Sequence, residues 1–153
     1  MKGSGKIRKL YSLGKRTLLC GGVFLLLGAV RLTLLVVPFK HIAARLGEKM
    51  GESPDAESWP AGRKAARIGW AVGKMSRYTP WESKCLVQAV TAHLLLRLFG
   101  LSYTLYLGLG LEKDEDGKLS AHAWLRCGDL IITGGREKEG FRSVAQFAGA
   151  GRR

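Results

Sequence analysis

The stretch TPWESKCLVQAVTAHLLLRLFG, residues 79–100, decides the fold because it combines a helix start with a cysteine. Thr79 suits an N-cap, Pro80 suits the first helical position, and Glu82 stands three residues after the cap. We predict a helix that begins here and ends at the glycine that closes the stretch. Cys85 then lies in its second turn, where unpaired N–H groups and the positive end of the helix dipole favour a thiolate.

Two antiparallel strands are predicted after this helix. Residues 103–111 alternate, with leucine at every second place from Leu105, as expected for a strand with one buried face. Residues 112–118 contain an Asp-Gly pair, which is typical of a hairpin loop. The run LSAHAWLR, residues 119–126, then forms the returning strand and brings His122 back towards the helix.

The flanking elements are shorter or less regular. Apolar residues at helical spacing predict helices at residues 39–50 and 64–78. A turn is expected at residues 127–129, a short strand at 130–133, and a last amphipathic segment at 141–148.

Cys85 and His122 have the residue types and the placement of a nucleophile and its base. Papain-like and transglutaminase-like enzymes assemble this pair from a cysteine at a helix start and a histidine on a neighbouring strand. His93 lies about 12 Å from Cys85 along the helix axis, too far for a hydrogen bond. Cys20 lies in an apolar stretch and Cys127 at a turn, and neither has a histidine arranged to activate it. The alternatives, an inert helix cysteine and an ordinary strand histidine, stay open at this point.

Two motifs resemble a known family. They are Pro80-Trp81-x-x-x-Cys85-Leu86-x-Gln88-Ala89 and Ala121-His122-Ala123-Trp124-Leu125. Together they are similar to the leader peptidase of lasso-peptide biosynthesis, the transglutaminase-like protease half of the B protein. The likeness extends from about Trp70 to Ala148 and includes Thr133-Gly134-Gly135 and the segment 141–147.

The resemblance implies an α+β fold, in which the cysteine helix of a papain/transglutaminase-like core packs on a small antiparallel sheet, preceded by N-terminal helices. It implies a cysteine peptidase that removes the leader from a ribosomally synthesised lasso precursor peptide and needs no cofactor. His122 would take the Cys85 proton, and the thiolate would form a thioester that water resolves. The implied partners are the precursor, a macrolactam-forming cyclase and a separate leader-recognition protein, since nothing before Cys85 resembles a leader-recognition domain. A transglutaminase-like acyltransferase or deamidase, and a non-enzymatic membrane-associated assembly module, are the alternatives.

The residue that orients His122 is not evident from the sequence. This fold usually uses an Asp or Asn from the strand after the histidine, which fixes the tautomer. Here that strand ends in Thr133-Gly134-Gly135, so Asp129, at the turn between the strands, is the candidate. A backbone carbonyl and the Thr133 hydroxyl are the alternatives.

Three further residues are candidates for the cleft. Gln88 lies one turn from Cys85 and belongs to the family motif, so it either donates to the oxyanion or is a plain surface glutamine. Trp81 either walls the cleft or packs at the helix start. Trp124 shares a strand face with His122 and is expected in the core or the cleft wall.

Charge is distributed unevenly over the 153 residues. The net charge is +13, and residues 1–50, with ten Lys/Arg and one acid, contribute +9 of it. We expect a basic, apolar helical segment at 1–50, a linker at 51–62 and the protease domain at 63–153. The basic segment is either a solvated terminus or a contact for anionic lipid or an acidic partner. Nucleic acid is disfavoured, because no aromatic residues are interleaved with the basic ones.

Three widely spaced cysteines predict a reducing compartment, the cytoplasm, rather than a disulfide scaffold. No metal site is expected, because no group of cysteines and histidines has the spacing of metal ligands.

Residues 18–39 form the most apolar stretch and allow three interpretations. A signal peptide would have a poor cleavage site at residues 28–31. A membrane span would place Arg31 inside the apolar run, at a cost of a few kcal/mol. The family resemblance favours the third, a buried or interfacial helical hairpin, broken near Pro38, that packs on the catalytic domain. We therefore expect peripheral association with a membrane or a partner.

Overall fold

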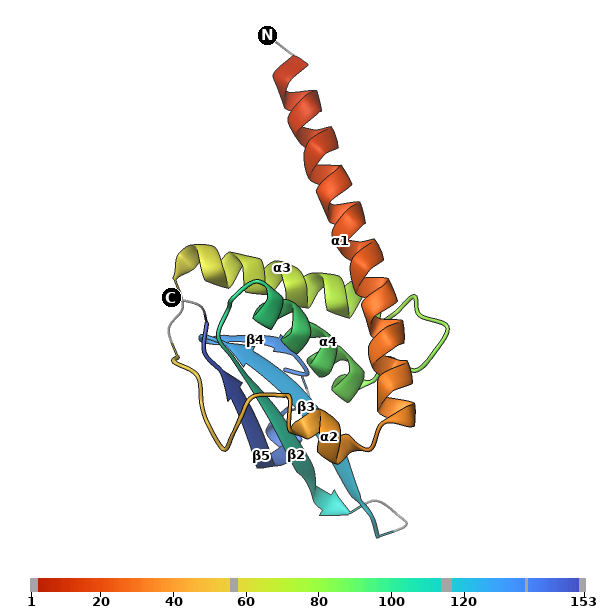
Figure 1. The fold of residues 1–153 in the computed structure, drawn as a ribbon, viewed down its shortest axis with the longest axis vertical. Coiled ribbons are helices and arrows are strands. Elements are labelled where there is room, and N and C mark those ends of the chain that lie inside the picture. The colour runs from red at the N-terminus through yellow and green to blue at the C-terminus, as the bar shows by residue number, and fades with distance from the viewer. Residues whose placement is uncertain (1–2, 56–57, 114–116, 137, 152–153) are drawn as a thin grey trace.

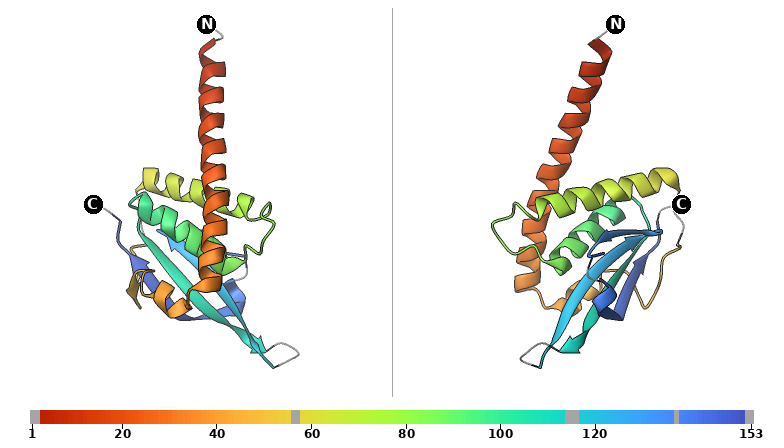
Figure 2. Two further views of the ribbon diagram at one scale, coloured as in Figure 1. Left: turned by 45° about the vertical axis from the view of Figure 1, so that its right-hand side comes forward. Right: turned by 180° about the vertical axis from the view of Figure 1, so that it is seen from behind.

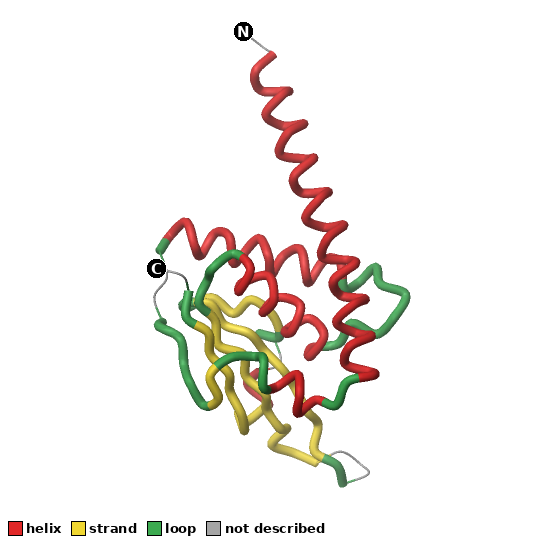
Figure 3. The backbone as a smooth tube through the Cα atoms, in the orientation of Figure 1, coloured by secondary structure: helices red, strands yellow, loops and turns green. Residues whose placement is uncertain are grey.

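The computed structural model describes residues 3–55, 58–113, 117–136 and 138–151 and has the predicted α+β architecture. Helices and strands form separate layers (Figure 1; Figure 3). In chain order the elements are α1 (Gly3–Val36), α2 (Phe39–Ala43), β1 (Glu48–Lys49), α3 (Trp59–Met75), α4 (Cys85–Leu98), β2 (Tyr103–Lys113), β3 (Leu119–Cys127), β4 (Leu130–Thr133), the 3₁₀ helix η1 (Lys138–Gly140) and β5 (Phe141–Gly149).

The strands form one antiparallel sheet in the order β1-β5-β2-β3-β4. The predicted strand pair is confirmed as β2 and β3, although part of the hairpin loop, residues 114–116, lies outside the described residues. Within the described sheet, β4 pairs with β3 only at Leu125, Arg126 and Cys127. The first half of β3, which carries His122, is therefore an edge of the sheet on that side.

α3 and α4 cover one face of the sheet (Figure 2). α4 is apolar almost all round because α1, α3 and the sheet surround it, and Ala89, Ala92 and Leu96 are fully buried. Leu105 and Leu125 meet it from the sheet and are also fully buried. Each buried leucine contributes about 1.5–3 kcal/mol to folding. The packing of α4 on the sheet therefore holds α4 in a fixed position relative to β3.

α1 is one continuous helix of 34 residues, and the predicted hairpin is wrong. Its second half packs on α3 and α4 through the buried side chains of Val23, Leu27 and Val30, while its first half projects from the domain (Figure 1; Figure 2). The chain turns only near Pro38, which lacks a backbone donor and disfavours helical geometry in the residue before it.

Residues Leu13–Val36 of α1 are long and apolar enough to cross a membrane. The apolar 18-residue window within them has a mean hydropathy of 2.2, and 17% of that window is buried against the domain. Leu18, Leu25 and Leu32 recur every seven residues on one side of the helix, and all three are exposed.

Three predicted helices have different bounds. The helix expected at 64–78 is α3, Trp59–Met75, and it begins inside the expected linker 51–62. The helix expected at 39–50 ends at Ala43, and the chain continues through turns to β1. The helix expected from Thr79 begins instead at Cys85. Thr79 Oγ1 lies 3.1 Å from the Trp81 carbonyl oxygen and 2.8 Å from Ser83 Oγ. Such local side-chain hydrogen bonds offer the backbone an alternative to the helix.

Candidate active site

Cys85 is the first residue of α4 and not, as predicted, a residue of the second turn. The first four N–H groups of a helix have no acceptor within it, so the Cys85 backbone N–H is available to a ligand at this end. The helix dipole adds positive potential at the same place. Lys84 precedes the cysteine, and its Nζ lies 2.9 Å from a Glu82 carboxylate oxygen.

A cavity of about 810 Å³ opens at this end of α4, and both Cys85 and His122 line it. The structure therefore brings the two predicted residues to one site. Ala123 and Leu125 pack into the helical core, so alternation along β3 directs His122 to the other face of the sheet. The cavity reaches both residues around the edge of β3 that β4 leaves uncovered.

The His122 ring has a defined partner. Its Nε2 lies 2.8 Å from the backbone carbonyl oxygen of Gly134, just after β4. A carbonyl can only accept, so Nε2 carries the proton in the neutral imidazole and Nδ1 is the basic nitrogen. A main-chain oxygen in this place can fix the tautomer of the histidine as an Asp or Asn side chain would.

Gly134 can approach His122 this closely because it has no side chain. Its φ is +72°, and an added Cβ would lie 2.4 Å from the Ala123 carbonyl oxygen, 2.9 Å from Trp124 Cβ and 3.0 Å from His122 Nε2. Any other residue would have to displace the histidine or the strand. The sequence motif contained this glycine, but its role becomes visible only once β4 is placed beside β3.

Asp129 lies at the turn between β3 and β4 and does not line the cavity. The five residues from His122 to Cys127 span about 16 Å along the strand, and Asp129 follows beyond them. Thr133 does line the cavity, and its buried hydroxyl has no hydrogen-bond partner among the described atoms. The hydroxyl oxygen is itself buried, and Gly134 rather than Thr133 is the hydrogen-bond partner of His122 Nε2.

Gln88 lines the cavity one turn along α4 from Cys85. Its Nε2 donates to the Ser83 carbonyl oxygen over 2.7 Å, which fixes the amide against the segment before the helix. An amide nitrogen has two hydrogens, so the second can serve an oxyanion next to the Cys85 N–H.

The two tryptophans lie around the site and not among its lining residues. Trp124 stacks on Tyr106 at 5.4 Å between ring centroids and on His122 at 5.9 Å, and it is buried. Phe141 contacts the His122 ring from another side at 4.9 Å. These rings hold the imidazole in a largely apolar setting, in which its hydrogen bond to Gly134 is not exchanged readily for water.

Trp81 packs on α1. Its ring lies 5.2 Å from the Phe24 ring, and the neighbouring Glu82 forms an ion pair with Arg31 of α1 at 3.3 Å. The segment before Cys85 is therefore held against the N-terminal helix.

The cavity is positively charged. Arg77, Lys84 and Arg136 line it, and none of its described lining residues is acidic. Sequence analysis missed Arg77 and Arg136 because they come from loops far apart in the chain, which only the fold brings together. These cations favour an anionic group of the substrate at the site. No three Cys, His, Asp or Glu side chains of the described segments are grouped as metal ligands.

Comparison with protein families gives one match. Residues 29–146 match the family described as the transglutaminase-like superfamily. The matched range begins in α1 and includes α4, the β2–β3 pair, β4 and most of β5, so it covers every residue of the cavity. No curated protein and no solved structure is significantly similar to the chain.

Proposed function

This chain belongs to the transglutaminase-like superfamily, and we propose that it is a cysteine peptidase that removes the leader from a ribosomally synthesised lasso precursor peptide. One observation carries the proposal: Cys85, at the start of α4, shares a cavity with His122, whose Nε2 bonds the Gly134 carbonyl. The motifs around Cys85 and His122 that resemble lasso leader peptidases support the choice of substrate.

The reaction begins with proton transfer from Cys85 Sγ to His122 Nδ1. The thiolate then attacks the carbonyl carbon at the junction of leader and core. The tetrahedral intermediate collapses, the C–N bond breaks, and the imidazolium returns its proton to the departing amine of the core peptide. The leader remains bound as a thioester. Water, deprotonated by His122, then attacks the thioester and releases the leader carboxylate and the thiol.

The oxyanion of the tetrahedral intermediate is stabilised by two donors. The Cys85 backbone N–H lies at the open end of the helix, and the second amide hydrogen of Gln88 lies one turn away. Loss of one such donor in comparable enzymes lowers kcat by about 10²–10³-fold.

The partners are proposed from the resemblance: a separate leader-recognition protein presents the precursor, and a cyclase uses the freed core amine. We further propose a cytoplasmic protein held peripherally at the membrane by α1. The exposed leucine stripe of α1, the net charge of +9 over residues 1–50 and the widely spaced thiols support this. Alkaline carbonate extraction should release the protein from membranes. Retention in the membrane pellet would instead mean that α1 crosses the membrane.

The activity is tested by incubating the full chain with precursor peptide and its leader-binding partner and following the products by mass spectrometry. We expect cleavage by the wild type, none by Cys85→Ala, and most of the wild-type activity in Cys20→Ala and Cys127→Ser. Cleavage by Cys85→Ala would refute the assignment.

Hydroxylamine added to the same reaction separates peptide hydrolysis from acyl transfer. A peptidase gives the free leader carboxylate as its main product at low hydroxylamine. A product that is chiefly the leader hydroxamate would favour an acyltransferase of the same superfamily.

A further inference from the structure

Two adjoining cavities lie at the opposite end of α4 from Cys85. One, of about 430 Å³, is a partly open groove lined by α1, α2, the turn after α2 and α4. The other, of about 570 Å³, is more open and is lined by the same turn, α4, β2 and the end of β5. Arg45 and Arg97 line both cavities and so mark the boundary between them. Arg97 is twelve residues after Cys85, about 18 Å along the helix axis, so these cavities are separate from the active site.

The smaller cavity is walled mainly by aliphatic side chains and has a volume in the range of ligand sites, about 300–1,000 Å³. These side chains come from the end of α1, from α2 and its following turn, and from α4: Val30, Leu34, Val37, Ile42, Leu46, Val90 and Leu94. Such walls offer hydrophobic contact and very few hydrogen bonds. An extended peptide would leave most of its backbone groups unpaired there, whereas an alkyl chain has none to satisfy.

His93 is a polar group in this apolar wall. It is only 1% exposed, and its Nδ1 has no hydrogen-bond partner among the described atoms. Its ring packs edge-on against Tyr103 at 4.6 Å between ring centroids, beside the apolar cavity.

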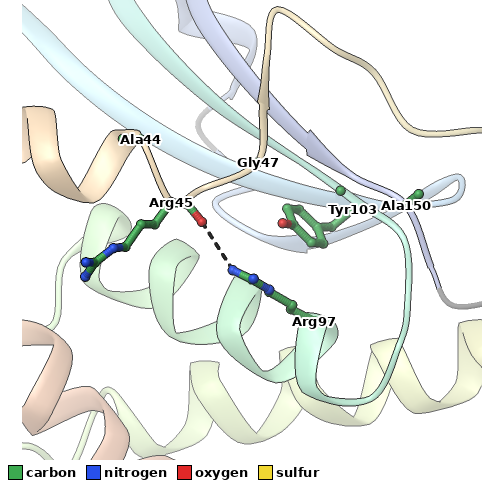
Figure 4. Close-up of a pocket in the computed structure, with 7 residues that line it drawn as sticks. Ala44, Arg45, Gly47, Arg97, Tyr103 and Ala150 are labelled. Carbon is green, nitrogen blue, oxygen red and sulfur yellow. Dashed lines mark hydrogen bonds between the residues drawn. The ribbon is translucent and has the colours of Figure 1, made fainter.

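Arg45 and Arg97 place positive charge where the two cavities meet. Arg97 is one helical turn after His93, so both side chains project from the same face of α4. Arg97 donates to the Arg45 carbonyl oxygen over 3.5 Å, and Tyr103 lies beside them (Figure 4). Over the described part of the chain, neither arginine forms an ion pair, and no acidic residue lines either cavity. Two guanidinium groups without a carboxylate suit an anionic ligand.

We propose that these cavities form one binding site for an aliphatic carboxylate, such as a medium-chain fatty acid. The alkyl chain occupies the apolar cavity, and the carboxylate lies at the boundary, where Arg97 and Arg45 pair with it. Val30 and Leu34 of this wall belong to α1, the helix that exposes Leu18, Leu25 and Leu32, so an acyl ligand can enter from that surface.

The test is a calorimetric titration of the full chain with dodecanoate below its micellar concentration. Dodecanol, which has the same alkyl chain but no charge, is the control ligand. We expect dodecanoate to bind about 10- to 100-fold more tightly than dodecanol, the range of one charge-assisted hydrogen bond. Arg97→Gln should remove that difference while leaving dodecanol binding unchanged. Arg63→Gln, on the exposed side of α3, should behave as the wild type.

A second pair of variants tests the apolar cavity. Leu94→Trp fills the cavity and should abolish binding of both ligands, and Leu98→Trp, one turn later and outside the cavity, should not. Both positions are exposed enough to accept tryptophan without disrupting the core. Soluble dioctanoyl phosphatidate, tested beside dodecanoate, shows whether a lipid phosphate can replace the carboxylate. Equal affinity for dodecanoate and dodecanol, wild-type binding by Leu94→Trp, or no binding of either ligand would overturn the proposal.

Discussion

The indole ring of Trp81 lies directly against the backbone of Gly28 in α1, so that an added Cβ at position 28 would come within 3.0 Å of Trp81 Cζ2. Trp81 stands four residues before Cys85, and the Arg31–Glu82 ion pair supports the same contact. The N-terminal helix α1 therefore helps to position Cys85, the first residue of α4.

Gly28→Leu should destabilise the protein and slow peptide cleavage, because the new side chain must displace Trp81 and with it the segment before Cys85. Overpacking of this kind costs about 1–3 kcal/mol of unfolding free energy. Gly21→Leu is the matched control, because nothing lies within 4 Å of its added Cβ, and it should gain up to about 1 kcal/mol of helix propensity. Urea unfolding and single-turnover cleavage measure both effects. Equal behaviour of the two variants would mean that the Trp81 contact does not position the site.

Gly134→Ala should reduce cleavage strongly, because its Cβ would collide with the Ala123 carbonyl oxygen and with His122 Nε2, which the Gly134 carbonyl orients. Gly117→Ala separates this effect from backbone strain: φ is +74° at Gly117 and +72° at Gly134, but nothing lies within 4 Å of a Cβ at Gly117. Both variants should lose similar backbone energy, of about 1 kcal/mol, and only Gly134→Ala should lose activity. An active Gly134→Ala enzyme would remove the Gly134 carbonyl from the proposed mechanism.

Asp129→Asn should retain the wild-type rate of single-turnover cleavage, because the side chain lies beyond the far end of β3 from His122. A catalytic Asp that orients a histidine can contribute about 10⁴-fold to kcat. A retained rate and the loss of an orienting carboxylate are therefore easy to tell apart in the Asp129 variant. Thr133→Val should also retain most of the wild-type rate, because the Gly134 carbonyl and not the Thr133 hydroxyl bonds His122 Nε2. A large loss in the Asp129 variant would restore the carboxylate as the orienting group.

Acid should destabilise the protein through His93. Burial, reinforced by the positive charge of Arg97, lowers its pKa from 6.5 to about 4. Between pH 6.5 and about 4 the unfolded chain binds a proton that the folded chain does not, so the unfolding free energy falls as the pH drops through this window. The full effect is about 3 kcal/mol at 1.36 kcal/mol per pKa unit.

Urea unfolding at pH 7 and pH 4.5 measures this contribution. His93→Leu should show a smaller acid loss than the wild type, and His41→Gln, an exposed histidine, should match the wild type. Identical pH dependence in wild type and His93→Leu would contradict the buried neutral state of His93.

Much of the fold was predictable from local pattern. Leucine at every second place in residues 103–111 predicted β2, and the following loop and LSAHAWLR run predicted β3. These signals are strong because one face of each strand is buried against α4. Cys85 and His122 could be placed at one site for the same reason: the helix, strand and hairpin that join them are short-range features.

Tertiary contacts decided what the sequence could not predict. Thr79, Pro80 and Glu82 have the chemistry of a helix start, but Trp81 packs on α1, and the helix begins only at Cys85. α1 continues through Gly21, Gly22 and Gly28 because its packed half is supported by α3 and α4. The orienting carbonyl of Gly134 belongs to the backbone, which no side-chain motif reveals.

The intact mass of the enzyme during turnover tests the central claim most directly. Reactions with precursor and leader-binding protein are quenched in acid within the first turnover, and peptide mapping locates any adduct. We predict an increase equal to the leader acyl group, carried on Cys85, sensitive to hydroxylamine and absent from Cys85→Ala. Cleaved precursor with an unmodified enzyme at every time point, or an adduct on Cys20 or Cys127, would contradict the account.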